Sequence, residues 1–175
     1  EKTMNTHLHI LEAYTNLYHV WPNSILKKQQ EALINLFLNK FINDDSHLNL
    51  FFTNTWENKS SVISYGHDIE CAWLLTEAAE AIKNKDLISK TRDVAISISE
   101  KFISEAIDID GGIINERNSK SGIVDVEKHW WQHAEALVGL MNAYTISNDD
   151  KFIEPIFDVW EFIKKKLIDH IDGEW

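Results

Sequence analysis

The sequence predicts an all-α protein made of three helix pairs, with short β-hairpin or loop segments between them. Apolar residues recur at helical spacing along most of the chain, breaks such as "WPN" and "DIDGG" separate the periodic segments, and a short polar motif recurs in every second helix. A chain of 175 residues is long enough for one domain with a sizeable core. We therefore expect residues 1–175 to form a single domain.

The first helix pair is predicted at residues 4–20 and from Ser24 to about residue 43. Trp21-Pro22-Asn23 ends the first helix, and Ser24 is a suitable cap for the second. The segment that follows, "HLNLFFTNTWENKSSVISY" (47–65), is rich in β-branched and aromatic residues. That composition predicts a short strand pair or an ordered loop.

The second and third pairs follow the same plan. Helices are predicted at about 66–83 and 87–106, then at about 129–146 and 150–171, with Pro155 tolerated because it lies near a helix start. Between the pairs, "DIDGGIINERNSKSG" (108–122) predicts a turn and strand, where Gly111 and Gly112 supply permissive backbone angles.

Composition narrows the class of protein. A formal charge of −11 leaves no basic surplus for nucleic acid, and no stretch approaches the ~20 apolar residues of a membrane span. The single cysteine, Cys71, excludes an internal disulfide framework and favours a reducing, cytoplasmic location. We expect neither a nucleic-acid nor a membrane partner.

A repeated motif carries the functional prediction. "HILEAY" (9–14), "HDIECA" (67–72) and "QHAEAL" (132–137) each place His or Gln three residues before Glu, which puts both side chains on one helical face. Glu12, Glu70 and Glu135 are 58 and 65 positions apart. A repeat of about 60 residues indicates a stacked or toroidal helical array, in which three equivalent helices direct polar groups into a shared space.

Three kinds of chemistry fit such a polar centre. A metal site is possible but disfavoured, because di-iron bundles use the reverse order, Glu-x-x-His. Glycoside hydrolysis could use Glu70 and Glu135 as a carboxylate pair. Proton transfer by histidine is favoured, because an imidazole can take and return a proton near neutral pH while a neighbouring carboxylate orients it. Trp130 and Trp131 would then offer an aromatic surface to a sugar ring.

Five segments together resemble the cellobiose 2-epimerases of the N-acylglucosamine 2-epimerase superfamily: "MNTHLHILEAYTNLY", "YGHDIECAWLL", "DGGIINE", "KHWWQHAEALVGLMNAY" and "DGEW". The resemblance covers nearly the whole chain. It implies an (α/α)6 barrel, of which this chain would be half, with 4–20, 66–83 and 129–146 as inner helices. It also implies an isomerase that epimerises C2 of the reducing-end glucose of cellobiose or lactose through a cis-enediolate, without a cofactor.

The resemblance also implies roles for individual residues. His67 matches a proton-transfer histidine and Glu70 the carboxylate that supports it, while Asn5 and His9 match residues at the reacting end of the sugar. Trp130 and Trp131 match sugar-contacting tryptophans, and Glu135 a pocket carboxylate. His133 stands where glutamine is expected, and its role is left open. His19, His47 and His170 are interpreted as surface or loop histidines.

The chain departs from this family in length. Family members are roughly twice as long, so three helix pairs are missing, and the family's second acid/base histidine has no counterpart here. Half a toroid would expose two apolar faces, and we expect it to form a homo-oligomer or to bind the missing half. Two further hypotheses stay open: an aldose–ketose isomerase or N-acylglucosamine 2-epimerase-like enzyme, and a non-catalytic sugar-binding or helical-repeat interaction module.

Overall fold

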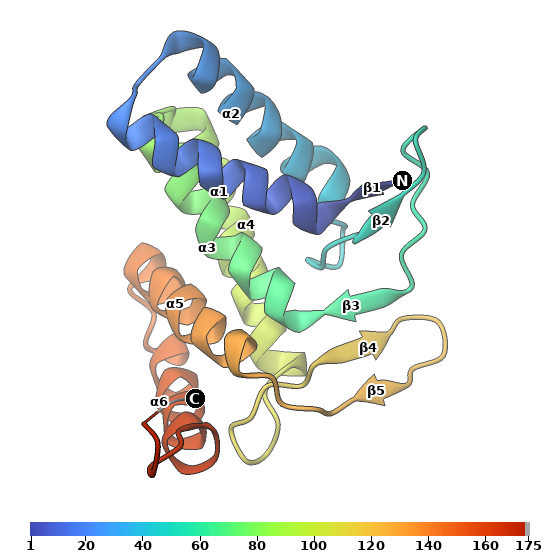
Figure 1. The fold of residues 1–175 in the computed structure, drawn as a ribbon, viewed down its shortest axis with the longest axis vertical. Coiled ribbons are helices and arrows are strands. Elements are labelled where there is room, and N and C mark those ends of the chain that lie inside the picture. Colours follow the sequence, from blue (N-terminus) through green and yellow to red (C-terminus); the bar gives the residue numbers. More distant parts are fainter. Residues whose placement is uncertain (174–175) are drawn as a thin grey trace.

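The fold, a computed structural model, is described for residues 1–173 and consists mainly of three consecutive helix pairs (Figure 1). The closing "DGEW" segment therefore lies partly outside the described residues. The helices are α1 (Met4–Val20), α2 (Ser24–Leu36), α3 (Tyr65–Ala81), α4 (Lys85–Glu105), α5 (Trp130–Ser147) and α6 (Ile153–Phe162). Short π-helical turns extend α2 (Phe37–Phe41) and α6 (Ile163–Leu167), and a 3₁₀ turn (Asp150–Phe152) precedes α6. The all-α prediction is confirmed.

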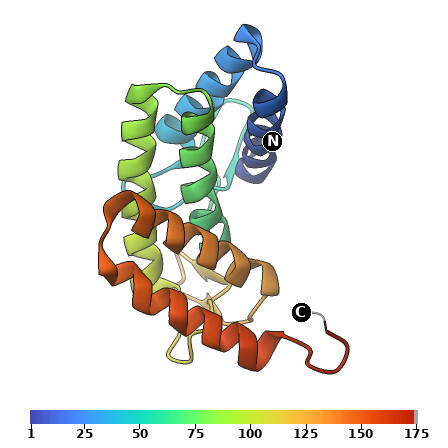
Figure 2. The ribbon, with the colours of Figure 1, turned by 90° about the vertical axis from the view of Figure 1, so that its left-hand side faces the viewer.

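The first helices of the three pairs are neighbours. α1 packs against α3 and α3 against α5, while α2, α4 and α6 each pack on the helix that precedes them. Seen from the side, the pairs follow one another along the long axis (Figure 2). None of the helices in residues 1–173 combines the length and apolar character needed to cross a membrane.

Five short strands lie where α1, α3 and α5 begin (Figure 1). β1 (Lys2–Thr3) pairs with β2 (Phe51–Phe52), and β3 (Val62–Ser64) joins β4 (Glu116–Asn118) and β5 (Val124–Asp125) in a second antiparallel sheet. Within residues 47–65, Phe52 and Asn58 form an isolated antiparallel bridge, in agreement with the predicted strand pair or ordered loop, while β2 and β3 belong to different sheets. β1 and β3 continue directly into α1 and α3, so the pairing of each strand fixes the position where its helix begins.

The residues at the starts of α2 and α6 have the expected chemistry, with one correction to the predicted cap of α2. Asn23, not Ser24, caps α2: its side-chain oxygen accepts hydrogen bonds from the Ile25 and Leu26 amides at 2.8 and 3.4 Å. Asn is at least as good an N-cap as Ser, and the helix begins one residue earlier than a Ser24 cap would place it. Pro155 lies in the first turn of α6, where a missing amide proton costs nothing.

The core forms two main clusters of buried apolar side chains. The first lies between α1, α2 and the C-terminal half of α3, and the second between α5, α6 and the loop before β4. Gly139 lets α5 approach α3 closely, because a Cβ there would lie 2.5 Å from Cγ1 of Ile69. This close packing sets the spacing of the helices that carry the repeated motifs.

Candidate functional site

The carboxyl groups of the three motifs act on one another. Burial and then the charge of Glu135 raise the pKa of Glu70 to about 7. Burial also raises the pKa of Glu135, against the effect of its hydrogen bond from Trp73, and the charge of Glu12 adds to the rise. Such coupling requires proximity. Helices α1, α3 and α5 therefore bring their motif glutamates into one region.

The two motifs that contain both His and Glu differ in their hydrogen bonds. His9 Nδ1 lies 3.0 Å from Glu12 Oε2, so the first motif forms an internal pair. His67 instead shares a hydrogen bond of 2.8 Å between Nδ1 and the Ser64 hydroxyl, and among the described residues no hydrogen bond joins it to Glu70. The support expected from Glu70 therefore does not take the form of a hydrogen bond to Nδ1, which Ser64, three residues earlier, already binds.

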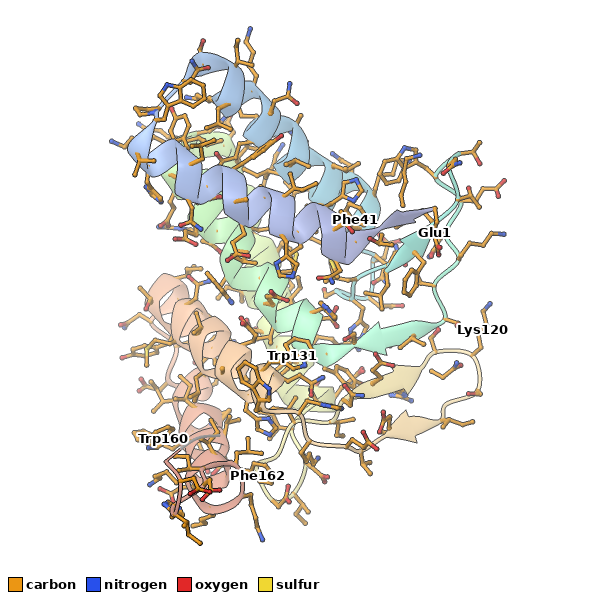
Figure 3. All side chains as sticks on the ribbon, in the orientation of Figure 1. Glu1, Phe41, Lys120, Trp131, Trp160 and Phe162 are labelled. Atoms are coloured by element: carbon orange, nitrogen blue, oxygen red, sulfur yellow. The ribbon has the colours of Figure 1, made fainter. Side chains whose placement is uncertain are left out.

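His67 sits in a tight, partly buried environment between α3 and α5. Burial and then the charge of His9 lower the pKa of His67 below its usual value of 6.5. Its ring lies 5.0 Å from that of Trp131, centroid to centroid, and Figure 3 shows Trp131 between the first turns of the two helices. Gly66 makes this approach possible, because a Cβ there would lie 2.5 Å from both Trp131 Cη2 and Gln132 Cγ.

His67 also lines a cavity of about 390 Å³ at the strand-bearing end of the molecule. Asn5, from the first turn of α1, lies on the same cavity. The remaining lining comes from both sheets, the start of α1 and the loop before β2: Thr3, Met4, Leu50, Phe51, Val62 and Glu116. His9, Glu70 and Glu135 lie outside this lining. The predicted site residues are therefore divided between the cavity and a carboxyl cluster, which consists of Glu12, Glu70 and Glu135.

The tryptophans expected to contact sugar differ in their surroundings. Trp131 is half-buried against His67, whereas Trp130 is 59% exposed at the start of α5. A third tryptophan, Trp73, donates a hydrogen bond of 2.7 Å from Nε1 to Oε2 of Glu135. It therefore ties α3 to α5 within the carboxyl cluster. Residues 1–173 contain no group of three or more His, Cys, Asp or Glu side chains placed to hold a metal ion.

Two histidines outside the predicted site are buried. His47 lies in a loop, as expected, but it is 4% exposed and forms a 2.7 Å contact with Asp68, so it is not a surface histidine. His133 is fully buried: its Nδ1 lies 2.7 Å from the His129 carbonyl, and its Nε2 accepts from the Ile113 amide. His133 therefore has a structural role, in connecting α5 to the loop before β4. Local sequence carries no signal for either set of partners.

Comparison with known proteins agrees with this geometry. A sequence profile for the family described as N-acylglucosamine 2-epimerase (GlcNAc 2-epimerase) matches residues 1–175. The chain is 47% identical to a cellobiose 2-epimerase of Bacteroides fragilis over 175 residues, covering 99% of this chain and 44% of that protein. It is 46% identical to one of Dictyoglomus turgidum, covering 100% and 45%.

Solved structures show the same relationship. The chain superimposes on a cellobiose 2-epimerase from Bacillus thermoamylovorans with a TM-score of 0.94 and 40% identity, covering 100% of this chain and 45% of that one. A D-mannose isomerase superimposes with a TM-score of 0.85 at 20% identity, which shows a shared fold alone. The chain thus spans a little under half the length of the curated relatives it matches, and it has the fold of half an (α/α)6 barrel.

Proposed function

This chain belongs to the N-acylglucosamine 2-epimerase family, and we propose that it supplies half of the active site of a carbohydrate 2-epimerase. The proposed reaction inverts C2 of the reducing-end glucose of a disaccharide such as cellobiose or lactose. The observation that carries the proposal is the position of His67, which lines a cavity with Asn5 and packs against the ring of Trp131.

His67 is the proposed base. Burial holds its pKa below 6.5, so the imidazole is neutral near pH 7 and can accept a proton. In the tautomer whose Nδ1–H donates to the Ser64 hydroxyl, Nε2 keeps a free lone pair. After ring opening, transfer of the C2 proton to Nε2 would give a cis-enediolate, and return of a proton to the opposite face of C2 would complete the inversion.

The other residues have supporting roles in this proposal. Asn5 and His9 would lie near the reacting end of the sugar and bind its oxygens, with His9 assisting ring opening. Glu70, whose pKa of about 7 lets it donate or accept a hydrogen bond near neutral pH, and Glu135 would bind sugar hydroxyls. Trp131, with the more exposed Trp130, would contact the C–H face of the sugar ring. The second proton-transfer group would come from the other half of the barrel.

Two exposed apolar surfaces support completion of the site by further helix pairs. One is a groove of about 540 Å³ on α5 and α6, lined by Leu137, Val138, Met141, Ile156, Phe157 and Trp160; Figure 3 shows Trp160 on the outer side of α6. The other lies at the turn between α1 and α2, where Val20, Trp21 and Ile25 are all more than half exposed.

We propose that three more helix pairs cover both surfaces, from the same polypeptide or from a second copy of this chain. Sedimentation velocity of the 175-residue chain tests the second-copy form, which a compact monomer at micromolar concentration would contradict.

Hydrogen exchange at C2 tests the proposed reaction. The chain is incubated with cellobiose in D2O, and NMR follows deuterium at C2 and the identity of the product. A mannose-containing product supports the epimerase, and a fructose-containing product would support the aldose–ketose isomerase instead. Sugar binding without exchange would support the non-catalytic binding module. His67→Ala should abolish exchange while His19→Ala, at an exposed position on α1, should not; undiminished exchange in His67→Ala would reject His67 as the base.

A further inference from the structure

The first turn of α3 carries His67 but has little anchorage of its own. Ser64 occupies the N-cap position, yet its side chain makes no capping hydrogen bond and binds the His67 ring instead. Gly66 lies in the same turn and lowers its intrinsic helical stability. Contacts from other elements must therefore hold this turn in place.

The residue after His67 supplies two of these contacts. Asp68 is 2% exposed and accepts hydrogen bonds from two donors in the loop at residues 42–50. His47 Nδ1 lies 2.7 Å from Asp68 Oδ2, and the Leu48 amide lies 2.9 Å from Asp68 Oδ1. Both carboxylate oxygens are thus bound by neighbouring residues of one loop.

The loop that presents His47 is itself well held. Ile42 and Leu48 form an antiparallel bridge, and the His47 amide donates to the Asn43 side chain at 3.0 Å. At its far end, the Leu50 carbonyl accepts from the Met4 amide at 2.8 Å. Leu50 also lines the cavity that contains His67. The loop therefore connects the Asp68 anchor to the wall of the proposed sugar site.

The second nitrogen of His47 faces a different partner. Nε2 lies 3.4 Å from Oε2 of Glu105, at the end of α4. Glu105 also accepts from the Tyr65 hydroxyl at 3.2 Å and pairs with Lys101 at 2.7 Å. With these alternative partners, Glu105 depends less on His47 than Asp68 does. The contact of Nδ1 with Asp68 and the contact of Nε2 with Glu105 can thus be tested separately.

We propose that His47 is a positioning residue for His67, acting through its Nδ1 contact with Asp68. Successive residues of an α-helix point about 100° apart, so holding Asp68 against the loop fixes the direction in which His67 leaves the helix. A buried ion pair adds little net stability compared with apolar packing, and its better-supported use is to specify one arrangement. The catalytic consequence rests on the proposed function, whereas the effect on the His67 side chain does not.

Two substitutions separate the nitrogens of His47. In His47→Asn the side-chain amide nitrogen lies near the former Nδ1 and can still donate to Asp68, whereas in His47→Gln it lies near the former Nε2 and faces Glu105. We expect His47→Gln to accelerate amide exchange at Gly66, His67 and Asp68 by about tenfold or more. It should also move the pKa of His67 upward toward 6.5 as water enters, in an NMR titration. His47→Asn should stay close to the native protein in both measurements.

Amides in the second half of α3, such as those of Ala78 and Ala79, serve as the internal reference and should be unaffected in both variants. If His47→Gln leaves the first turn and His67 unchanged, or if both variants disturb them equally, the proposal is overturned and His47 acts by packing. If His47→Gln does not fold, Asp68→Asn replaces it, because its side-chain oxygen can still accept from the Leu48 amide. Amide exchange in the first turn of α3 and the NMR titration of His67 are then measured on Asp68→Asn, with the same criteria for the role of His47.

C2 exchange adds a kinetic readout. If the chain exchanges the C2 proton, His47→Gln should lower kcat about tenfold with a smaller change in KM, and His47→Asn should restore most of the rate. An equal loss in both variants would contradict the proposal. A chain without measurable exchange would reject the proposed function alone, because the NMR measurements on His67 still test the role of His47.

Discussion

The Trp73 indole donates a 2.7 Å hydrogen bond to the Glu135 carboxylate, across an interval of 62 residues. This bond joins α3 to α5 inside the carboxyl cluster, where burial otherwise raises the pKa of Glu135. It therefore stabilises the charged form of a group that its surroundings favour as neutral.

Trp73→Phe should remove this bond while keeping an aromatic ring. Because the lost partner is a partly buried carboxylate, we expect a loss of about 1–3 kcal/mol in the free energy of unfolding, measured in urea at about pH 8. The pKa of Glu135 should rise further. Trp130→Phe, at a position 59% exposed, is the matched control and should change stability by less than about 0.5 kcal/mol. Equal, small effects in both variants would show that the bond contributes little.

Glu70→Gln should make the protein more stable at alkaline pH. The folded-state pKa of about 7 lies above the ordinary 4.5. Ionisation therefore costs stability progressively as the pH rises from about 4.5 to about 7. At about 1.4 kcal/mol per pH unit, the gain at about pH 8 has an upper bound of about 3.5 kcal/mol. Urea unfolding across this range measures it, with Glu77→Gln on the exposed face of α3 as control. A gain that does not grow with pH would exclude this cause.

Gly66→Ala should destabilise the protein, although alanine usually stabilises a helix interior by up to about 1 kcal/mol over glycine. The new Cβ would lie 2.5 Å from Trp131 Cη2 and from Gln132 Cγ, so the indole must move. We expect a loss of about 1–3 kcal/mol and a change in Trp131 fluorescence. Thermal unfolding gives the sign, and an increase in Tm would show that α5 moves aside without strain.

His47 should make stability fall as the pH rises. Burial disfavours its charged form, but the hydrogen bond and charge of Asp68, together with the charge of Glu105, outweigh that effect and hold the pKa of His47 above 6.5. Its contribution is therefore complete below about pH 6.5 and is lost as the pH rises through the folded-state pKa. The difference in unfolding free energy between the native protein and His47→Ala should shrink between about pH 6 and about pH 9. A difference that is constant across this range would mean that the pair does not titrate as argued.

The helices were predictable because each has an apolar stripe and clear breaks. The predicted ranges 4–20 and 129–146 agree with α1 and α5 to within one residue at each end. The position of the repeated motif on alternate helices was predictable for the same reason, since residues three apart must share a face. Local helical geometry was therefore sufficient to predict that part of the candidate site.

The hydrogen-bond partners of the site were not predictable in this way. His67 binds Ser64 rather than Glu70, Glu135 binds Trp73, and the loop residue His47 is buried against Asp68. β2 and β3 likewise pair with distant strands rather than with each other. Glu135 and His47 bind groups that arrive from elsewhere in the chain, whereas Ser64 and Glu70 are equally close to His67 in sequence and only the packed structure decides between them.

Periodicity in the chain was thus sufficient to specify three helix pairs and to put imidazole and carboxyl groups on their facing sides, because that information lies within one or two helical turns. Packing of α3 against α5 and against the loop at residues 42–50 decided which of those groups touch, how deeply each is buried and therefore how each titrates. Burial and charge coupling are properties of assembled elements, and they arise only once the helices meet.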